Sequence, residues 1–207
     1  MKLIAVILLM LSTHLAVAST VTIDFQSIEQ VNNRVNVVGN TYSEDGYTLA
    51  AGGLSNNGTF NGFLSFGTLT NGYRFLDSTG LFKSNRGFIS LTKSNRAAFN
   101  FLSIDLAAVE PGPRAVAITF NAEDSAGNTF QKTVQSTGVL ATYVFGDYFN
   151  NIVGLSWLQE IGSKSHQFDN IVVSSADTVS AVPVPASLWL FGSAMLGFCG
   201  LRRKKLA

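Results

Sequence analysis

The fold is decided by residues 98–134, which read AFNFLSIDLAAVEPGPRAVAITFNAEDSAGNTFQKTV. Within this stretch, the segments 98–106, 115–120 and 128–134 read as β-strands. Turn-forming residues cluster between the segments, at 110–113 and 123–128. The stretch therefore predicts consecutive strands joined by turns.

The same pattern continues on both sides of this stretch. Asn-Gly dipeptides, which supply the positive φ values of tight hairpins, stand among aromatic residues over 57–73. No part of the body has a convincing 3.6-residue apolar period, so no helix is expected there. The sequence predicts an all-β fold, an antiparallel β-sandwich over 19–177. The further strands are expected at 21–25, 47–50, 88–91, 152–157 and 167–174.

The charge distribution excludes some classes of partner. Five of the 14 Lys and Arg lie in the terminal segments and none of the 13 Asp and Glu do, so residues 19–181 carry a net charge of −4. Binding to nucleic acid needs a basic face to neutralise phosphates, so no nucleic-acid partner is expected. The single cysteine, Cys199, lies near the C-terminus, so the body holds no disulfide and is stabilised by its core.

Residues 1–18 have the three parts of a signal peptide in order. Lys2 supplies the positive charge, an apolar run covers 3–11, and Ala16-Val17-Ala18 is the small-x-small pattern that signal peptidase cuts. We expect cleavage after Ala18. The alternative is a buried N-terminal helix.

The C-terminal segment, 178–207, is organised for a membrane. A small, Pro-containing linker includes Val182, Pro183, Val184 and Pro185, and an apolar run at about 186–201 follows it. This length is at the short end for a transmembrane helix. The basic end, expected to stay cytoplasmic and stop transfer, leaves the body outside. Its residues are Arg202, Arg203, Lys204 and Lys205.

The segment VPVPASLWLFGSAMLGFCGLRRKK resembles the PEP-CTERM sorting signal, in which a Pro-Glu-Pro-like motif precedes an apolar helix and an Arg-rich end. The resemblance implies processing by an exosortase, a membrane cysteine-protease-like enzyme, during export. This chain departs from the family at Val184, which stands where the family has its central Glu. The alternative is a plain tail anchor with a basic stop-transfer end.

A second resemblance covers the body. The segments TIDFQS, FNFLSIDLA, AITFNAEDSAGNTF and HQFDNIVV occur in an order similar to that of jelly-roll, galactose-binding-like modules of exported bacterial proteins. In such modules a structural calcium lies between acidic residues of the first and last strands, and Asp24 and Asp169 occupy comparable places. Two carboxylates need further oxygen ligands to hold Ca²⁺. The alternative is that Asp169 and Asn170 order the strand end by hydrogen bonds to the backbone.

Residues of catalytic type are sparse in the body. His166 is its only histidine, and the segment Gly154-Leu155-Ser156-Trp157-Leu158 lacks the second glycine of a nucleophile elbow. We therefore expect a non-enzymatic protein with no certain cofactor. Trp157 is the candidate for stacking against a glycan, and the alternative is that it packs in the core.

A four-residue repeat, Lys-Ser-Asn-Arg, occurs at 83–86 and again at 93–96. Two basic loops of this kind could meet an anionic glycan. The favoured interpretation is simpler: two polar hairpin ends lie on either side of one strand.

These features together predict an exported, membrane-sorted protein of the cell surface or extracellular matrix. It would be processed by signal peptidase and an exosortase, anchored through the C-terminal helix or released after processing, and associated with exopolysaccharide. The alternatives are a carbohydrate-binding module with a defined glycan ligand and an unrecognised secreted hydrolase.

Overall fold

The computed structural model describes residues 19–28, 35–53, 62–66, 80–109, 115–161 and 164–176. The chain divides into two compact units, Met1–Ala176 and Asp177–Ala207. The described residues all belong to the first unit, and they form an all-β fold. Strand pairs throughout this part are antiparallel, as the turn-rich sequence predicted.

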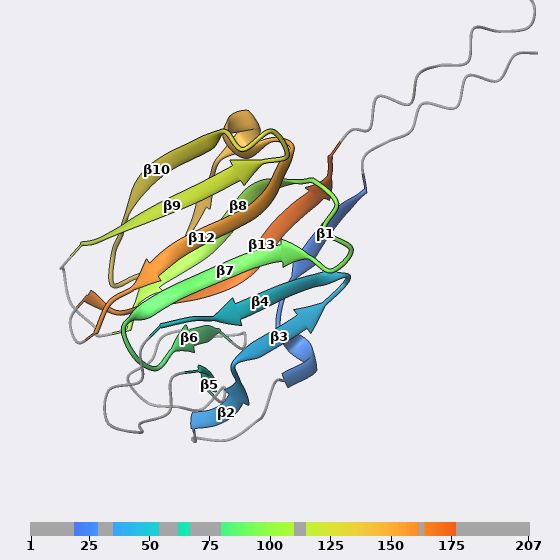
Figure 1. Ribbon diagram of the computed structural model, residues 1–207. Coiled ribbons are helices and arrows are strands. Elements are labelled where there is room, and N and C mark those ends of the chain that lie inside the picture. Colours follow the sequence, from blue (N-terminus) through green and yellow to red (C-terminus); the bar gives the residue numbers. More distant parts are fainter. Residues whose placement is uncertain are drawn as a thin grey trace, which may run out of the picture. The chain divides into compact units, whose positions relative to one another are not determined.

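The strands form two layers (Figure 1), which makes the unit a β-sandwich. In sheet 1 the strand β13 (His166–Ser175) pairs with β8 (Phe99–Ala108) on one edge and with both β1 (Thr20–Ile23) and β6 (Leu81–Lys83) on the other. The order of sheet 1 is β11 (Ala141–Val144), β8 (Phe99–Ala108), β13 (His166–Ser175), then β1 (Thr20–Ile23) and β6 (Leu81–Lys83), β5 (Phe63–Phe66) and β2 (Val35–Gly39).

Sheet 2 supplies the second layer, and β12 lies near its centre between β9 and β7. A single pairing, Ile152 with Phe99, connects the two sheets. Two short 3₁₀ helices, η1 (Gln26–Ile28) and η2 (Gly146–Phe149), complete the described elements. The order of sheet 2 is β10 (Thr129–Ser136), β9 (Val116–Asp124), β12 (Ile152–Gln159), β7 (Gly87–Lys93), β4 (Tyr47–Ala51) and β3 (Thr41–Glu44).

Alternation along each strand sends one set of side chains into the space between the sheets. In β9, for example, Val116, Ile118, Phe120 and Ala122 are buried. The core is unusually aromatic, and ring centroids lie 5.0–5.8 Å apart for Phe101 against Phe145 and Phe120. Aromatic packing of this kind buries large areas at low entropic cost, which suits a domain with no disulfide.

The predicted strands are confirmed, with shifted ends. The turn cluster at 123–128 begins later than expected, because β9 continues through Asp124. The two Lys-Ser-Asn-Arg segments lie at the two ends of β7, as the simpler interpretation held. Five short strands were not predicted: β2, β3, β5, β6 and β11. In the part of the chain that the structure describes, no helix is long and apolar enough to cross a membrane.

Phe25, which follows the first strand of the sandwich, has a strained backbone that hydrogen bonds hold in place. Phe25 is fully buried although its φ is 58°, a left-handed value that non-glycine residues seldom adopt. Its amide donates to Glu44 Oε2 at 3.2 Å, and Tyr42 Oη donates to the same oxygen at 3.0 Å. Burial raises the pKa of Tyr42 to about 12, so this phenol stays protonated and keeps donating. The network thus offsets the cost of the Phe25 backbone.

The outer edge of sheet 2 is covered by two tyrosines. Among the described strands, β10 pairs with β9 alone, so its other edge has no strand partner there. Tyr143 Oη donates to the carbonyl of Gln135 at 2.7 Å, and Tyr148 Oη donates to that of Gln131 at 2.6 Å. Lys132 Nζ lies 5.0 Å from the centre of the Tyr148 ring and holds it by a cation–π contact. The two tyrosines occupy carbonyls of this edge and stand beside it, which hinders the approach of a strand from another chain.

We expect the double substitution Tyr143→Phe and Tyr148→Phe to lower stability and to open this edge. Each lost hydrogen bond costs about 1 kcal/mol, so the melting temperature should fall, and analytical ultracentrifugation should show self-association. Each single variant exposes one carbonyl and should have an intermediate effect. A double variant that has the melting temperature and the sedimentation behaviour of the wild type would contradict the capping role.

Candidate functional site

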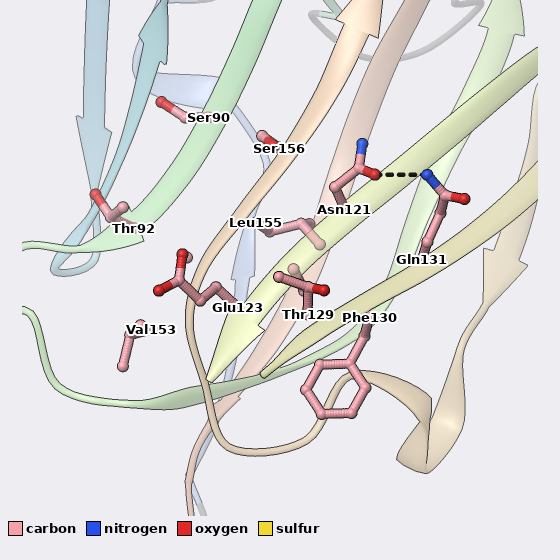
Figure 2. A pocket seen from close by; sticks show the side chains of 12 residues that line it. Ser90, Thr92, Asn121, Glu123, Thr129, Phe130, Gln131, Val153, Leu155 and Ser156 are labelled. Carbon is pink, nitrogen blue, oxygen red and sulfur yellow. Dashed lines mark hydrogen bonds between the residues drawn. The ribbon is translucent and has the colours of Figure 1, made fainter. Parts of the chain in front are cut away.

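The outer face of sheet 2 carries a row of polar side chains that crosses four strands. Ser156 on β12 pairs with Ser90 on β7 and with Asn121 on β9, and Asn121 pairs with Gln131 on β10. All four side chains point away from the core, because their neighbours along each strand are the residues that point inward. Gln131 Nε2 donates to Asn121 Oδ1 at 2.8 Å, as Figure 2 shows, which orients both amides.

A second row lies two residues further along the strands. Glu123 on β9 pairs with Gly154 on β12 and with Thr129 on β10. The register of β12 shifts between Ile152 and Gly154, which is a bulge. A Cβ at Gly154 would meet only Thr92 Cγ2, at 3.9 Å. The absence of a side chain at this position therefore leaves open space in the middle of the row.

These two rows line a groove with a cavity volume of about 710 Å³. Figure 2 shows hydroxyl, amide and carboxylate groups from four strands around it. Small side chains at the centre of the sheet and longer ones on β9 and β10 make the hollow. Its lining residues are Ser90, Thr92, Asn121, Ala122, Glu123, Thr129, Phe130, Gln131, Val153, Gly154, Leu155 and Ser156.

The chemistry of the lining is that of hydrogen bonding. Hydroxyl groups both donate and accept, and side-chain amides offer donors and an acceptor. Glu123 is the one charged residue among the lining residues, and it is exposed. Hydrolysis of a glycosidic bond ordinarily uses a pair of carboxylates, and the lining of this groove holds a single one. The groove is therefore suited to holding an uncharged polar molecule.

The structure corrects the expectation for Trp157. Its side chain is 0% exposed, and its ring lies 5.4 Å from Phe120 and 5.3 Å from Phe168, centre to centre. A sugar cannot reach a face of this indole, so Trp157 has the core role that was its alternative. The inward position follows from its place on β12, where residues that alternate with the outward Ser156 face the core.

His166 is the hydrogen-bond partner of this tryptophan. Trp157 Nε1 donates to His166 Nε2 at 3.1 Å, and His166 is fully buried. The bond requires a neutral imidazole with Nε2 unprotonated, and burial lowers the pKa of His166 to about 3. Among the described residues its Nδ1 has no hydrogen-bond partner, so no carboxylate in that part of the chain orients it. The described residues therefore form no Ser-His-Asp arrangement on His166.

Asp24 and Asp169 lie where β1 and β13 stop pairing. The last pair is Ile23 with Ile171, and Asp24 follows it directly. Asp24 Oδ1 accepts from the amide of Gln26 at 3.0 Å, and Asp169 Oδ1 accepts from that of Asn170 at 2.8 Å. These bonds fit the hydrogen-bonding alternative.

Asp24 and Asp169 supply two carboxylates, whereas Ca²⁺ takes six to eight oxygen ligands. Among the described residues, no group of three or more His, Cys, Asp and Glu could hold a metal ion. The calcium site stays a prediction, and the proposed function does not depend on it.

The predicted targeting residues lie outside the described residues. They comprise the cleavage site, the sorting motif, the apolar run at 186–201 and the basic end. These residues are Ala16, Ala18, Val182, Pro183, Val184, Pro185, Arg202, Arg203, Lys204 and Lys205.

The groove residues were not identified from the sequence. Each of the four strands alternates in the usual way, so their outward residues could have been named, but nothing in the sequence indicates which strands lie next to each other. One local signal was present: Gly154 interrupts an otherwise apolar strand, and an isolated glycine in a strand often marks a bulge or a close approach.

Comparison with known proteins bears on the two units differently. Residues 181–204 match the PEP-CTERM protein-sorting motif. This finding confirms the resemblance seen in the C-terminal sequence. No curated protein matches the chain.

Solved structures similar to the chain include carbohydrate-binding modules of family 29. A mutant complexed with mannohexaose is 16% identical, with 77% of this chain and 93% of that chain covered and a TM-score of 0.38. Another family 29 module is 14% identical, with 82% and 99% covered and a TM-score of 0.38.

The buried His166 predicts a pH dependence of stability. Its pKa is lowered from 6.5 to about 3 in the folded state, so the unfolded chain binds a proton first as the pH falls. Its contribution is complete above about pH 6.5 and is lost towards pH 3, at up to about 1.4 kcal/mol per pH unit. Urea unfolding at pH 7.5, 6.5 and 5.5 should show this loss.

His166→Gln is the control for this experiment, because His166 is the only histidine in 19–181. The variant should be less stable at pH 7.5 and nearly independent of pH down to 5.5. Parallel curves for the two proteins would contradict the assignment.

Proposed function

We propose that this chain is an exported, non-catalytic protein of the cell surface or extracellular matrix that is processed by an exosortase and binds exopolysaccharide through the groove of sheet 2. The observation that carries the proposal is the PEP-CTERM sorting motif at residues 181–204. The motif implies export and membrane sorting. The groove provides the surface through which the described unit would bind exopolysaccharide outside the cell.

Neutral polysaccharide is the ligand class that suits the groove best. Sugars present many hydroxyl groups, and the lining offers matching hydroxyls and oriented amides, among them Ser90, Ser156, Asn121 and Gln131. A body with a net charge of −4 disfavours strongly anionic polymers. The four strands from β7 to β10 span about 14 Å, at about 4.8 Å per strand, so the groove has room for more than one sugar unit.

The runner-up function is a carbohydrate-binding module with one defined glycan. The same groove supports it, and selectivity separates the two: a matrix protein should bind several neutral polymers weakly, and a dedicated module one of them tightly. The unrecognised hydrolase has less support, because the groove lining holds a single carboxylate and His166 is buried.

The sorting half is tested by the mass of the mature C-terminus. In a host with its exosortase, we expect the wild-type protein to lack the segment that follows the Pro-x-Pro motif. In the same host without the exosortase, the full tail should remain and the protein should stay in the membrane fraction. Val184→Glu, which restores the central Glu of the motif, should be processed at least as completely. An intact tail in both hosts would contradict exosortase processing and support the alternative, a plain tail anchor.

The groove is tested by filling it. Gly154 lies outside the left-handed region and a Cβ there has room, so Gly154→Val should fold normally and occupy the centre of the groove. We expect binding to neutral polysaccharide to weaken about tenfold, as a loss of about 1.4 kcal/mol would cause. Affinity electrophoresis in gels that contain the polymer measures this retardation.

Ala117→Val is the matched control for the groove. Ala117 is exposed on β9, on the same sheet face, and does not line the groove. This variant should bind like the wild type. Equal binding by Gly154→Val would remove the groove from the proposal and leave the sorting half standing.

A further inference from the structure

An exposed phenylalanine lies beside the groove. On β7, Gly87, Ile89 and Leu91 are buried, so Phe88, Ser90 and Thr92 face outward. Phe88 is 55% exposed, and it is the one exposed large hydrophobic residue on a strand of sheet 2 in the described part of the chain. The rest of this face is made mainly of hydroxyl, amide and charged groups.

The register places Phe88 at the end of the groove. Phe88 pairs with Leu158 on β12, and the next outward pair along these two strands is Ser90 with Ser156, which lines the groove. Two residues along a strand are about 7 Å, so the phenylalanine and the groove lie within reach of one extended ligand. From Phe88 to Thr92 the surface covers about 13 Å along β7.

Among the described residues, the other neighbours of Phe88 leave much of its ring exposed. On the β4 side the adjoining residue is Gly52, whose amide donates to the Phe88 carbonyl at 2.8 Å and which has no side chain to shield the ring. Beyond the Phe88–Leu158 pair, Arg86 and Glu160 form an ion pair at 3.2 Å. The apolar pair is therefore bounded by charge on one side and by the polar groove on the other.

We propose that Phe88 and Leu158 form a stacking platform that continues the groove, so that a neutral polysaccharide that lies across the strands in the groove extends over β12 and β7 with one sugar unit against the Phe88 ring. This proposal rests on the proposed function of the groove. A pyranose has an apolar C–H face and hydroxyl groups around its edge. The platform can contact the apolar C–H face, and the groove can bind the hydroxyl groups.

The size of the apolar surface favours a glycan over a second copy of this chain. One aromatic side chain buries about 150–250 Å², whereas a stable protein interface takes about 800 Å² from each partner. A ligand that combines small apolar faces with many hydroxyls uses both parts of this surface at once.

The test uses the full-length protein in detergent, with affinity electrophoresis in gels that contain dextran, galactomannan, hydroxyethyl cellulose or alginate. We expect Phe88→Ala to weaken retardation by the neutral polymers about tenfold, with an unchanged melting temperature because the side chain is exposed. Val144→Ala is the matched control, because Val144 is 71% exposed on β11 in the other sheet. It should bind like the wild type.

A length series of oligosaccharides from the best polymer gives the second readout. The wild type should gain affinity as the oligosaccharide lengthens beyond the groove, and Phe88→Ala should lose that gain while it keeps the binding of the shortest ligands.

The outcomes separate the platform from the groove. Wild-type binding by Phe88→Ala, with weak binding by Gly154→Val, overturns the platform and leaves the groove. No retardation of the wild type by any polymer overturns both. Reduced self-association of Phe88→Ala with unchanged retardation assigns the patch to a second copy and also overturns the platform.

Discussion

The pairing of β13 with β8 is the interaction on which the rest of the structure depends. These ten-residue strands lie side by side at the centre of sheet 1, with partners from His166–Ala108 to Ser175–Phe99. The free edge of β13 then receives β1 and β6, which come from distant parts of the chain. Since β13 is the last strand of the unit, sheet 1 is completed only when the end of the body has been made.

This placement also governs sheet 2. The short connection from β12 to β13 crosses between the layers, so Trp157 on one strand meets Phe168 and His166 on the other. With its inward side chains held there, β12 must present Gly154 and Ser156 outward between β7 and β9. The groove and the proposed platform at Phe88 are therefore consequences of the register that the core imposes, because a shift of one residue would reverse every side chain.

In the described part of the chain, the largest aromatic side chains pack in the core, and few are exposed for recognition of a ligand. Trp157, Phe101 and Phe120 bury their rings completely, and the domain has no disulfide to replace the stability that they provide. Only a few large hydrophobic side chains of the described residues remain exposed, and Phe88 is the one that stands on the face with the groove. Residue type alone would rank tryptophan above phenylalanine as a sugar platform. Burial reverses that order here.

The sequence by itself determined the local features of this protein: the strands at 98–134, the turn between β9 and β10, the sandwich class and the sorting motif at 181–204. The predicted turn at 110–113 lies outside the described residues. Each of these local features depends on residues near one another in the chain, through strand periodicity, turn chemistry or a linear motif. The short strands such as β5 and β6 escaped prediction because three or four residues carry too little periodicity. Only the tertiary structure decided that Trp157 is buried, that Asp24 and Asp169 bond to the backbone, and that Ser90, Ser156, Asn121 and Gln131 form one row. Those facts depend on which strands pair and in what register, which is settled by burial of the whole core.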